Sequence, residues 1–288
     1  MDIESKKFLG QPKNFVSIFN ALLFDGQPVL KPEYLKDENS ELVMNVSSKH
    51  VDIIKRYEDG TYLDLFVIES QSYVDQCMVA RVMEYESVAR MRYIRQNFKK
   101  HVPMHTRLPM ILTVVLYVGE SKWNAAKRLS ELEIIHPGFE DMFNEFKLNL
   151  IELNTNHKYN TGEKATQDFF DLLRMIYRKQ ILKEDLDREF NRDALYFAYV
   201  VTKNKELLNI YQESEKGDVK VCRALDEMFE ESTNKGIQMG IKQGIEQGSE
   251  KKELEMYQKM MDKGFEIKTI ASIFSVSEES IKTLLMRT

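Results

Sequence analysis

The sequence predicts an α/β protein whose core runs helix, three strands, helix and strand, followed by an all-helical C-terminal half. Three observations predict this class. Apolar residues switch from a helical period to strand-like alternation and back within residues 15–97. An Asp59-Gly60 pair between two alternating segments is typical of a β-hairpin. A continuous apolar run at 109–117 is typical of a strand that is buried on both faces.

Each expected element follows from its own local pattern. Helical spacing of apolar residues predicts the first helix, and Asp25-Gly26 ends it. Alternation of apolar and polar residues predicts the three strands. We expect a helix over 15–23, strands over 42–47, 50–57 and 62–70, a second helix over 75–97, the buried strand over 109–117 and a further strand over 147–153.

The remainder of the chain reads as helical from residue 165 onward. Four glycines, at 236, 240, 244 and 248, recur every four residues and indicate either close approach between helices or a flexible, partly helical connector. We therefore expect four parts: a core at 1–155, a helical middle region packed on it at 156–233, a glycine-punctuated connector at 234–250 and a small helical tail at 251–288.

The tail pattern predicts two short helices that are joined tightly. Its apolar positions are Ile270, Ile273, Val276, Ile281 and Leu284. A helix-turn-helix would fit this pattern, but the last helix carries only Lys282 and Arg287 as basic residues. We therefore favour packing, or homo-oligomerisation through the C-terminal helices, over base recognition.

Charge and composition exclude several classes of protein. The net charge is −5, from 41 basic and 46 acidic residues, so any DNA binding must come from a local basic patch. Two cysteines exclude a disulfide scaffold and a four-cysteine zinc site, and they fit a reducing cytoplasm. The chain starts without an apolar export segment and has no apolar run near the ~20 residues of a membrane span. We expect a cytoplasmic protein.

The hairpin sets which side chains share a face of the sheet. A turn of two or four residues places Lys55 opposite Asp64 and Asp52 opposite Val67. The first of these pairs is most simply an ion pair between strands.

In this register Asp52, Glu69 and Gln71 project to the same side, and the two carboxylates are diagonal neighbours. Such a pair suits a hard divalent cation. The alternative is that both are solvated charges, although neighbouring Ile54 and Val67 indicate a covered face, where an unpaired carboxylate is costly. A slip of one residue would send Asp52 to the other face and remove the site.

Residues of distinctive type follow one another along the core. They are Asp52, Glu69-Ser70-Gln71-Ser72, Asp75, Arg81 and Tyr85, and later Tyr117, Gly119 and Trp123. In this order they resemble the PD-(D/E)XK nuclease superfamily, and more narrowly its branch of recombination-promoting nucleases (Rpn), also described as YhgA-like putative transposases. The resemblance covers most of the chain and is most specific over residues 15–123.

The resemblance implies a restriction-endonuclease-like αβββαβ core with a mixed sheet and a metal-dependent DNA endonuclease linked to recombination or mobile elements. It implies that Asp52 and Glu69 bind Mg2+, or Mn2+ in its place, with Gln71 as the third catalytic residue and Asp75 and Tyr85 in support.

Two departures from the wider superfamily pattern leave an alternative open. Gln71 stands where a lysine is commoner, although glutamine is usual in this branch; an amide orients a water but brings no positive charge. The extra acid of the first helix has no clear counterpart, and Asp25 is the nearest candidate. The alternative is a catalytically inactive DNA-binding or assembly protein that retains the fold.

A basic segment follows the expected site. Residues 90–107 carry six basic and no acidic side chains. They form either a patch that contacts DNA phosphates or a solvated helix end favoured by the helix dipole, and a neighbouring nuclease site favours the patch. Arg81 either stabilises phosphate or pairs with an acid such as Glu84. The expected DNA contacts are Arg81, Arg90, Arg92, Arg95, Lys99 and Lys100.

Overall fold

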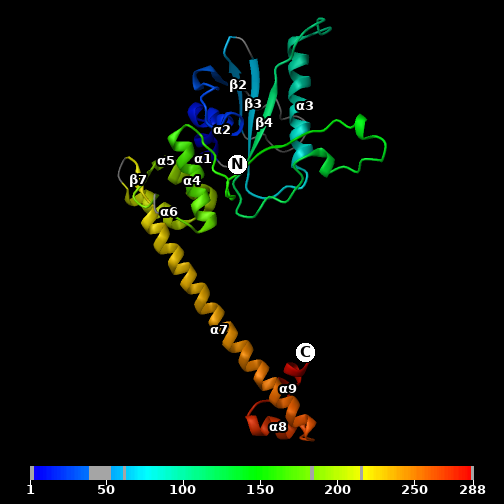
Figure 1. Cartoon of the computed structure of the whole chain (residues 1–288), viewed down its shortest axis with the longest axis vertical. Coiled ribbons are helices and arrows are strands. Elements are labelled where there is room, and N and C mark those ends of the chain that lie inside the picture. The colour runs from blue at the N-terminus through cyan, green and yellow to red at the C-terminus, as the bar shows by residue number, and fades with distance from the viewer. Residues whose placement is uncertain (1–2, 39–52, 61–62, 182–184, 215–216, 287–288) are drawn as a thin grey trace. The chain divides into compact units, whose positions relative to one another are not determined.

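The structure, a computed structural model, describes residues 3–38, 53–60, 63–181, 185–214 and 217–286. Its residues form two compact units, Met1–Leu225 and Asp226–Thr288. The first unit contains the sheet and most of the helices, and the second contains the C-terminal helices (Figure 1).

A five-stranded mixed sheet lies at the centre of the first unit. The strand order is β1-β2-β3-β4-β5. The first three strands are antiparallel neighbours, whereas β4 runs parallel to both β3 and β5. The strands are β1 Leu35–Asp37, β2 Ile53–Glu58, β3 Leu63–Gln71, β4 Ile111–Tyr117 and β5 Asn149–Glu152. The prediction of an α/β protein with a mixed sheet is confirmed.

Helices cover both faces of this sheet (Figure 1). Helix α2, Pro12–Phe24, packs on one face, where the rings of Phe19 and Phe66 lie 4.9 Å apart. Helix α3, Met78–Asn97, packs on the other, where Tyr85 joins an apolar cluster with Val67. Because side chains alternate along a strand, odd-numbered residues of β3 face α3 and even-numbered ones face α2.

The β2–β3 hairpin has the predicted faces but a different register. Tyr57 pairs with Asp64, the residue that was expected opposite Lys55. The turn is centred one residue later than expected, because Glu58 pairs with Leu63, and this moves every pair by two positions. A shift of two leaves each side chain on its predicted face.

The new register makes the predicted ion pair between Lys55 and Asp64 wrong. Lys55 instead pairs with Asp37 of β1 at 2.6 Å. The Asp64 carboxylate accepts a hydrogen bond from the Met110 backbone N–H at 3.1 Å, and burial raises its pKa. Each group therefore has a partner on a different element from the one expected.

The first strand differs from its prediction as well. The strand expected over 42–47 lies outside the described residues. The structure instead pairs Leu35–Asp37 with β2, in a stretch for which the sequence pattern predicts no strand. Three residues are too few to show a periodicity, so this edge strand carries no signal in the sequence.

The remaining helices of the first unit pack around an aromatic cluster. In it, the ring centroid of Phe169 lies 4.4 Å from that of Phe197 and 5.7 Å from that of Phe8. The helices are α1 Ile3–Leu9, α4 Lys164–Arg178, α5 Arg192–Thr202 and α6 Lys205–Glu213. Strands β6, Glu189–Phe190, and β7, Val219–Lys220, pair antiparallel here. The expectation of an all-helical C-terminal half is therefore wrong at these two strands. Each strand has two residues, which is too few to show the alternation of apolar and polar residues. Single 3-10 turns span Pro32–Tyr34, Leu129–Glu131 and Glu140–Met142.

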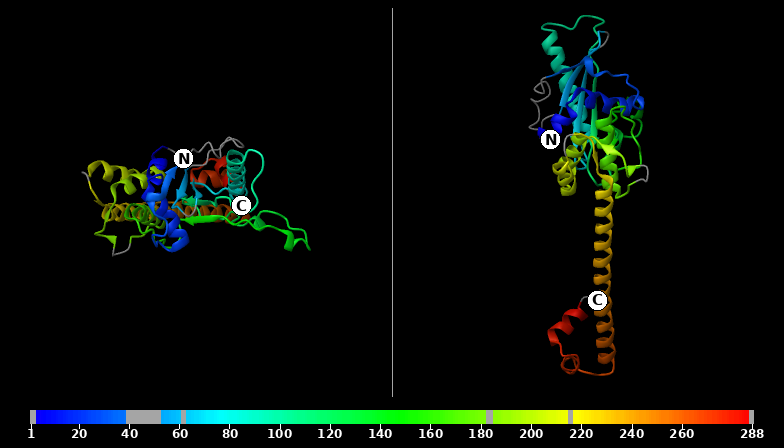
Figure 2. Two further views of the ribbon diagram at one scale, coloured as in Figure 1. Left: turned by 90° about the horizontal axis from the view of Figure 1, so that it is seen from above. Right: turned by 90° about the vertical axis from the view of Figure 1, so that its left-hand side faces the viewer.

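A 41-residue helix, α7 (Cys222–Asp262), leads into the C-terminal unit. It includes the glycine-rich stretch as continuous helix. The two predicted short helices are confirmed as α8, Ile267–Phe274, and α9, Glu278–Leu285. Both return beside the C-terminal end of α7 (Figure 2), where Tyr257, Ile270 and Ile281 form a small core. Among the described residues, no helix combines the length and apolar character needed to cross a membrane.

Candidate functional site

Two polar side chains of the predicted site lie at the C-terminal end of β3. Glu69 and Gln71 face α3 and are each 4% exposed. Their expected neighbour Asp52 lies outside the described residues, and Val67, its predicted partner, pairs with Ile54 instead. The structure thus places Glu69 and Gln71 on one covered face, and the position of Asp52 stays a prediction.

Arg81, near the start of α3, reaches back to this end of the sheet. Its Nη2 donates to Glu69 Oε1 at 3.1 Å, and its Nη1 donates to Asp75 Oδ2 at 2.5 Å. Nε and Nη2 also donate to Tyr85 Oη, at 3.1 and 2.8 Å. Arg81 therefore pairs with two acids of the site, and Glu84, the acid suggested by sequence spacing, is not among its hydrogen-bonding partners in the described part of the chain.

Burial shapes the electrostatics of this cluster. The side chains of Arg81 and Glu69 are 17% and 5% exposed. Burial alone would lower the pKa of Arg81, but hydrogen bonds to Asp75 and Tyr85 and the charge of Glu69 raise it above its usual value. Burial raises the pKa of the Tyr85 hydroxyl, and the hydrogen bond from Arg81 offsets only part of this. The guanidinium is thus a fixed cation, and Tyr85 stays neutral at physiological pH.

Asp75 connects the end of β3 to the start of α3. Its Oδ1 accepts the Cys77 backbone N–H at 2.9 Å, and its Oδ2 accepts from Arg81. A carboxylate at a helix start satisfies a free N–H and interacts favourably with the helix dipole. This contact orients Arg81 toward the sheet, which gives the Asp75–Arg81–Tyr85 spacing a structural reason.

The described residues offer part of a metal site. Glu69 supplies a carboxylate, and the Gln71 amide is buried with no hydrogen-bond partner for its Nε2 among the described residues. No group of three or more His, Cys, Asp or Glu that could hold a metal ion occurs in the described part of the chain. A carboxylate and an amide oxygen are hard ligands that fit Mg2+, and a second carboxylate would have to come from elsewhere.

The Tyr-x-Gly segment, which begins with the last residue of β4, stabilises this end of the sheet. The rings of Tyr117 and Trp123 meet edge to face with centroids 5.0 Å apart. A Cβ on Gly119 would come within 2.6 Å of the Ser72 backbone oxygen, so only glycine fits beside the loop that follows β3. These residues support the segment that carries Gln71.

The predicted basic segment lies along α3, away from Glu69. Arg95 follows Arg81 by fourteen residues, a rise of about 21 Å along the helix axis. Arg90 lies 3.9 Å from Glu86, while Arg95, Lys99 and Lys100 are exposed. The structure therefore places Arg95, Lys99 and Lys100 at the end of α3 away from Glu69, whereas Arg81 lies half-buried in the site.

Asp25, the weak candidate for a first-helix acid, lies elsewhere. It caps α2 at its C-terminal end in the left-handed conformation, with φ of 50°. Since α2 packs on the face opposite Glu69, the structure does not bring these two carboxylates together.

Sequence reasoning missed several buried acids, and Glu86 and Asp168 are two of them. Glu86 on α3 is 7% exposed and accepts the Thr113 backbone N–H at 3.0 Å. Asp168 on α4 is fully buried and accepts from Arg188 at 2.5 Å and from Lys164 at 2.7 Å. The four-residue spacing of Lys164 and Asp168 was a visible signal, but the contact with Arg188 joins separate segments.

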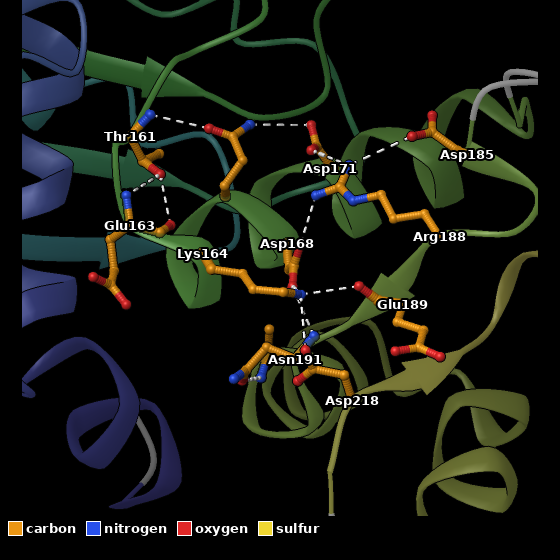
Figure 3. A network of polar contacts seen from close by, with 12 residues as sticks. Thr161, Glu163, Lys164, Asp168, Asp171, Asp185, Arg188, Glu189, Asn191 and Asp218 are labelled. Carbon is orange, nitrogen blue, oxygen red and sulfur yellow. Dashed lines mark hydrogen bonds and ion pairs between the residues drawn. The ribbon is translucent and has the colours of Figure 1, made fainter.

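Asp168 belongs to a polar network that ties α4 to β6 (Figure 3). Arg188 also pairs with Asp171 at 2.8 Å, and Lys164 pairs with Asp218 at 3.2 Å. The Asn191 backbone N–H donates to Asp168 at 2.7 Å. Four aspartates, Asp168, Asp171, Asp185 and Asp218, pair with Arg188 or Lys164 in this network, so we interpret it as a structural clasp between α4 and β6.

Comparison with models of known families gives a match over more than half of the chain. The sequence model of a family described as "Putative transposase, YhgA-like" matches residues 33–207. That range contains the whole five-stranded sheet, the Glu69–Arg81 cluster and most of the network around Asp168. No curated protein and no solved structure matches the chain.

Proposed function

Because this chain belongs to the family of YhgA-like putative transposases, we propose that it is a metal-dependent DNA endonuclease that acts in recombination or on mobile elements. The family description associates the chain with mobile elements and implies DNA as the substrate. Phosphodiester hydrolysis and the metal are our proposal. The observation that carries it is the buried Glu69 carboxylate, which lies on one covered face with Gln71 and accepts from Arg81.

The proposed core is restriction-endonuclease-like. In its support, helix α2 is followed along the chain by strands β1, β2 and β3, then by α3 and β4, in a mixed sheet. The active groups of the proposed site sit on the central strand β3 and on the helix that follows it. A rigid strand and helix are suited to holding such groups in a fixed geometry.

The proposed metal ligands are Glu69 and Asp52. Asp52 directly precedes Ile53 in the chain, and Ile53 pairs with Ile68, the residue before Glu69. Two carboxylates, completed by waters, form a donor set that suits Mg2+ or Mn2+. Such an ion supplies charge stabilisation at the scissile phosphate and acidifies a water.

The other residues act around these ligands. The Gln71 amide can orient a water by hydrogen bonding, because its Nε2 is buried without a partner in the described chain. Arg81 holds Glu69 in place and brings a permanent positive charge to a site in which Gln71 replaces the more usual lysine. Asp75 and Tyr85 fix the guanidinium.

The proposed DNA path extends along α3. Arg92 and Arg95 provide positive charge in its last turns, about 17 and 21 Å along the helix axis from Arg81, and Lys99 and Lys100 follow the helix. Phosphates recur along duplex DNA, so contacts at this distance position the backbone without reading sequence.

A plasmid-nicking assay with purified protein tests the proposal. We expect conversion of supercoiled DNA to the open circle with Mg2+ or Mn2+ and none with chelator. Replacing the metal ligands, Glu69→Gln or Asp52→Asn, should lower the nicking rate by at least about 100-fold, because each change removes a charged oxygen ligand.

The matched control is Asp64→Asn. It alters a carboxylate of the same strand, on the opposite face and near the other end, and keeps an oxygen that can accept the Met110 N–H. This variant should nick at the wild-type rate. Nicking that survives both ligand replacements, or that ignores the chelator, would contradict the proposal.

A second candidate is a DNA-binding or assembly protein without catalytic activity. The ion pair between Arg81 and Glu69 favours it, because the guanidinium already neutralises the carboxylate that the metal would use. Divalent-independent DNA binding by wild-type protein, together with absence of nicking under every metal condition, would identify this second function.

A further inference from the structure

Large apolar side chains are exposed in the middle of α7. Three of them, Ile237, Ile241 and Ile245, are 55%, 58% and 67% exposed and recur every four residues. Residues four apart lie on the same side of a helix. We call these three residues the isoleucine row. A contiguous exposed apolar surface of this kind marks a site of interaction.

The composition of this stretch of α7 disfavours an isolated helix. Four glycines alternate with the isoleucine row, and glycine is the poorest helix former apart from proline. Apart from the adjacent residues and the neighbouring backbone of the same helix, no described atom lies within 4 Å of a Cβ built on any of these glycines. Most helical stability in proteins comes from packing of an apolar face, so a helix of this composition needs a partner.

We propose that the isoleucine row binds a second copy of itself, with the two α7 helices antiparallel and centred between Gly240 and Ile241. In this arrangement Ile237 of one protomer lies opposite Gly244 of the partner subunit. Rows of residues four apart form the ridges by which helices pack, and an isoleucine that meets a glycine lets the backbones approach closely. A twofold interface requires a surface complementary to itself, and this row meets that condition.

Charges beside the row select the antiparallel orientation. Glu230 and Lys251, both exposed, are equally far from the proposed centre. In the antiparallel pair Glu230 therefore lies opposite Lys251 of the partner subunit, and symmetry forms this pair twice. In a parallel pair each residue would face its own copy, which places like charges together and disfavours that alternative.

Sedimentation analysis of the full-length chain tests the proposal. Wild-type protein should form a concentration-dependent dimer. The double change Ile237→Glu with Ile241→Glu should weaken dimerisation at least about ten-fold, because it places charges in the apolar contact. The matched control is Met239→Glu, which adds the same charge at a side chain that is 64% exposed and lies on the opposite side of the helix. This control should dimerise like the wild type.

A charge exchange tests the orientation independently of the apolar row. Lys251→Glu alone should weaken the dimer several-fold at low salt, since it creates two like-charge contacts. Adding Glu230→Lys to the same chain should restore it. Far-ultraviolet circular dichroism of each variant establishes that the helices remain.

Three results would overturn the proposal. A monomeric wild type at all concentrations would exclude the dimer. Equal weakening by Met239→Glu and by the double isoleucine change would remove the row from the interface. Failure of the charge exchange to restore the dimer would exclude the antiparallel register. All three are independent of nicking, so they do not depend on the proposed function.

Discussion

At the scale of single residues, Arg81 is the centre of the candidate site. It contacts Glu69, Asp75 and Tyr85 through separate N–H groups of one guanidinium. Lysine has a single ammonium and could not reproduce this planar arrangement. The stability of the site and its proposed chemistry therefore depend on the same side chain.

We predict that Arg81→Met lowers the free energy of unfolding by about 3 kcal/mol, because it removes the cation that pairs with the buried Glu69 and with Asp75. Denaturant unfolding measures the change. Combining it with Glu69→Gln should recover part of the loss, because the buried charge is then removed as well. Arg90→Met is the control: Arg90 is 43% exposed and 3.9 Å from Glu86, so its change should cost under about 1 kcal/mol. Equal losses for the two arginines would contradict this role of Arg81.

Glu86 should make stability depend on pH. Burial raises its pKa, and hydrogen bonding from Thr113 offsets only part of the effect. The folded state thus binds the proton more tightly than the unfolded state. The resulting stabilisation is complete below the unfolded pKa of about 4.3 and is lost as the pH rises through the folded pKa.

The variant Glu86→Gln keeps an acceptor for the Thr113 N–H and is neutral at every pH. We predict that the wild type loses stability relative to this variant as the pH rises from 4 to 8, as measured by urea unfolding at each pH. A difference that is constant with pH, or that changes in the wild type's favour, would show that Glu86 is ionised without cost in the folded protein.

At the scale of elements, the network around Asp168 joins α4 to the segment that carries β6 (Figure 3). Arg188 contacts Asp168 and Asp171 of the helix and stacks over Phe190 with its guanidinium carbon 4.6 Å from the ring centroid. The two residues of β6 have too few backbone contacts to be stable alone. Their position thus depends on this arginine.

We predict that Arg188→Met destabilises the chain by about 2 kcal/mol, since the fully buried Asp168 would lose one of its two cationic partners and keep only Lys164. Thermal or denaturant unfolding measures it. Arg223→Met is the control, because the side chains of Arg223 and its partner Asp187 are 82% and 80% exposed, and we expect no measurable change. If both variants unfold alike, the clasp does not stabilise α4 and β6.

The elements also show how far sequence reasoning reaches. Helical periodicity predicted α2 and α3 within a few residues, and the continuous apolar run predicted β4, because each element is long enough to show its period. The short strands β1, β6 and β7 have only two or three residues each, so they show no period in the sequence. The hairpin was predicted on its correct faces, but its register depends on the turn, which Asp59-Gly60 fixes only to within a residue.

The candidate site was predictable to a similar degree. Alternation along one strand places Glu69 and Gln71 together, and this needs only local sequence. The contacts of Arg81 with Glu69 and Asp75 join β3, a loop and α3, so they depend on how the helix packs. Buried Glu86 and Asp168 were missed because a charged residue in a helix looks the same in sequence whether it faces solvent or a partner.

At the scale of the whole molecule, positive charge for DNA must be local, because the net charge is −5. We predict that neutralising Arg92, Arg95 and Lys99 together weakens DNA binding and lowers the slope of log K against log salt by about 2 to 3, one counterion for each lost phosphate contact. Binding titrations at several salt concentrations measure the slope.

The matched control neutralises three exposed lysines of the second unit, Lys242, Lys259 and Lys263, which changes the net charge by the same amount. Its slope should equal that of the wild type. If both triple variants shift the slope equally, DNA responds to overall charge and the end of α3 is no specific contact.

The mixed sheet has a consequence for how the chain assembles. Strand β2 meets β3 across a short turn, and hairpins of this kind close within about 1–10 μs. Strand β4 meets β3 only after the chain has passed through α3, so this parallel pairing requires closure of a long loop and comes later. In the interval, one edge of β3 exposes backbone groups beside Phe66 and Ile68, and such an edge readily pairs with another chain. The yield of refolding should therefore fall as the protein concentration rises, under conditions in which the native state is still stable.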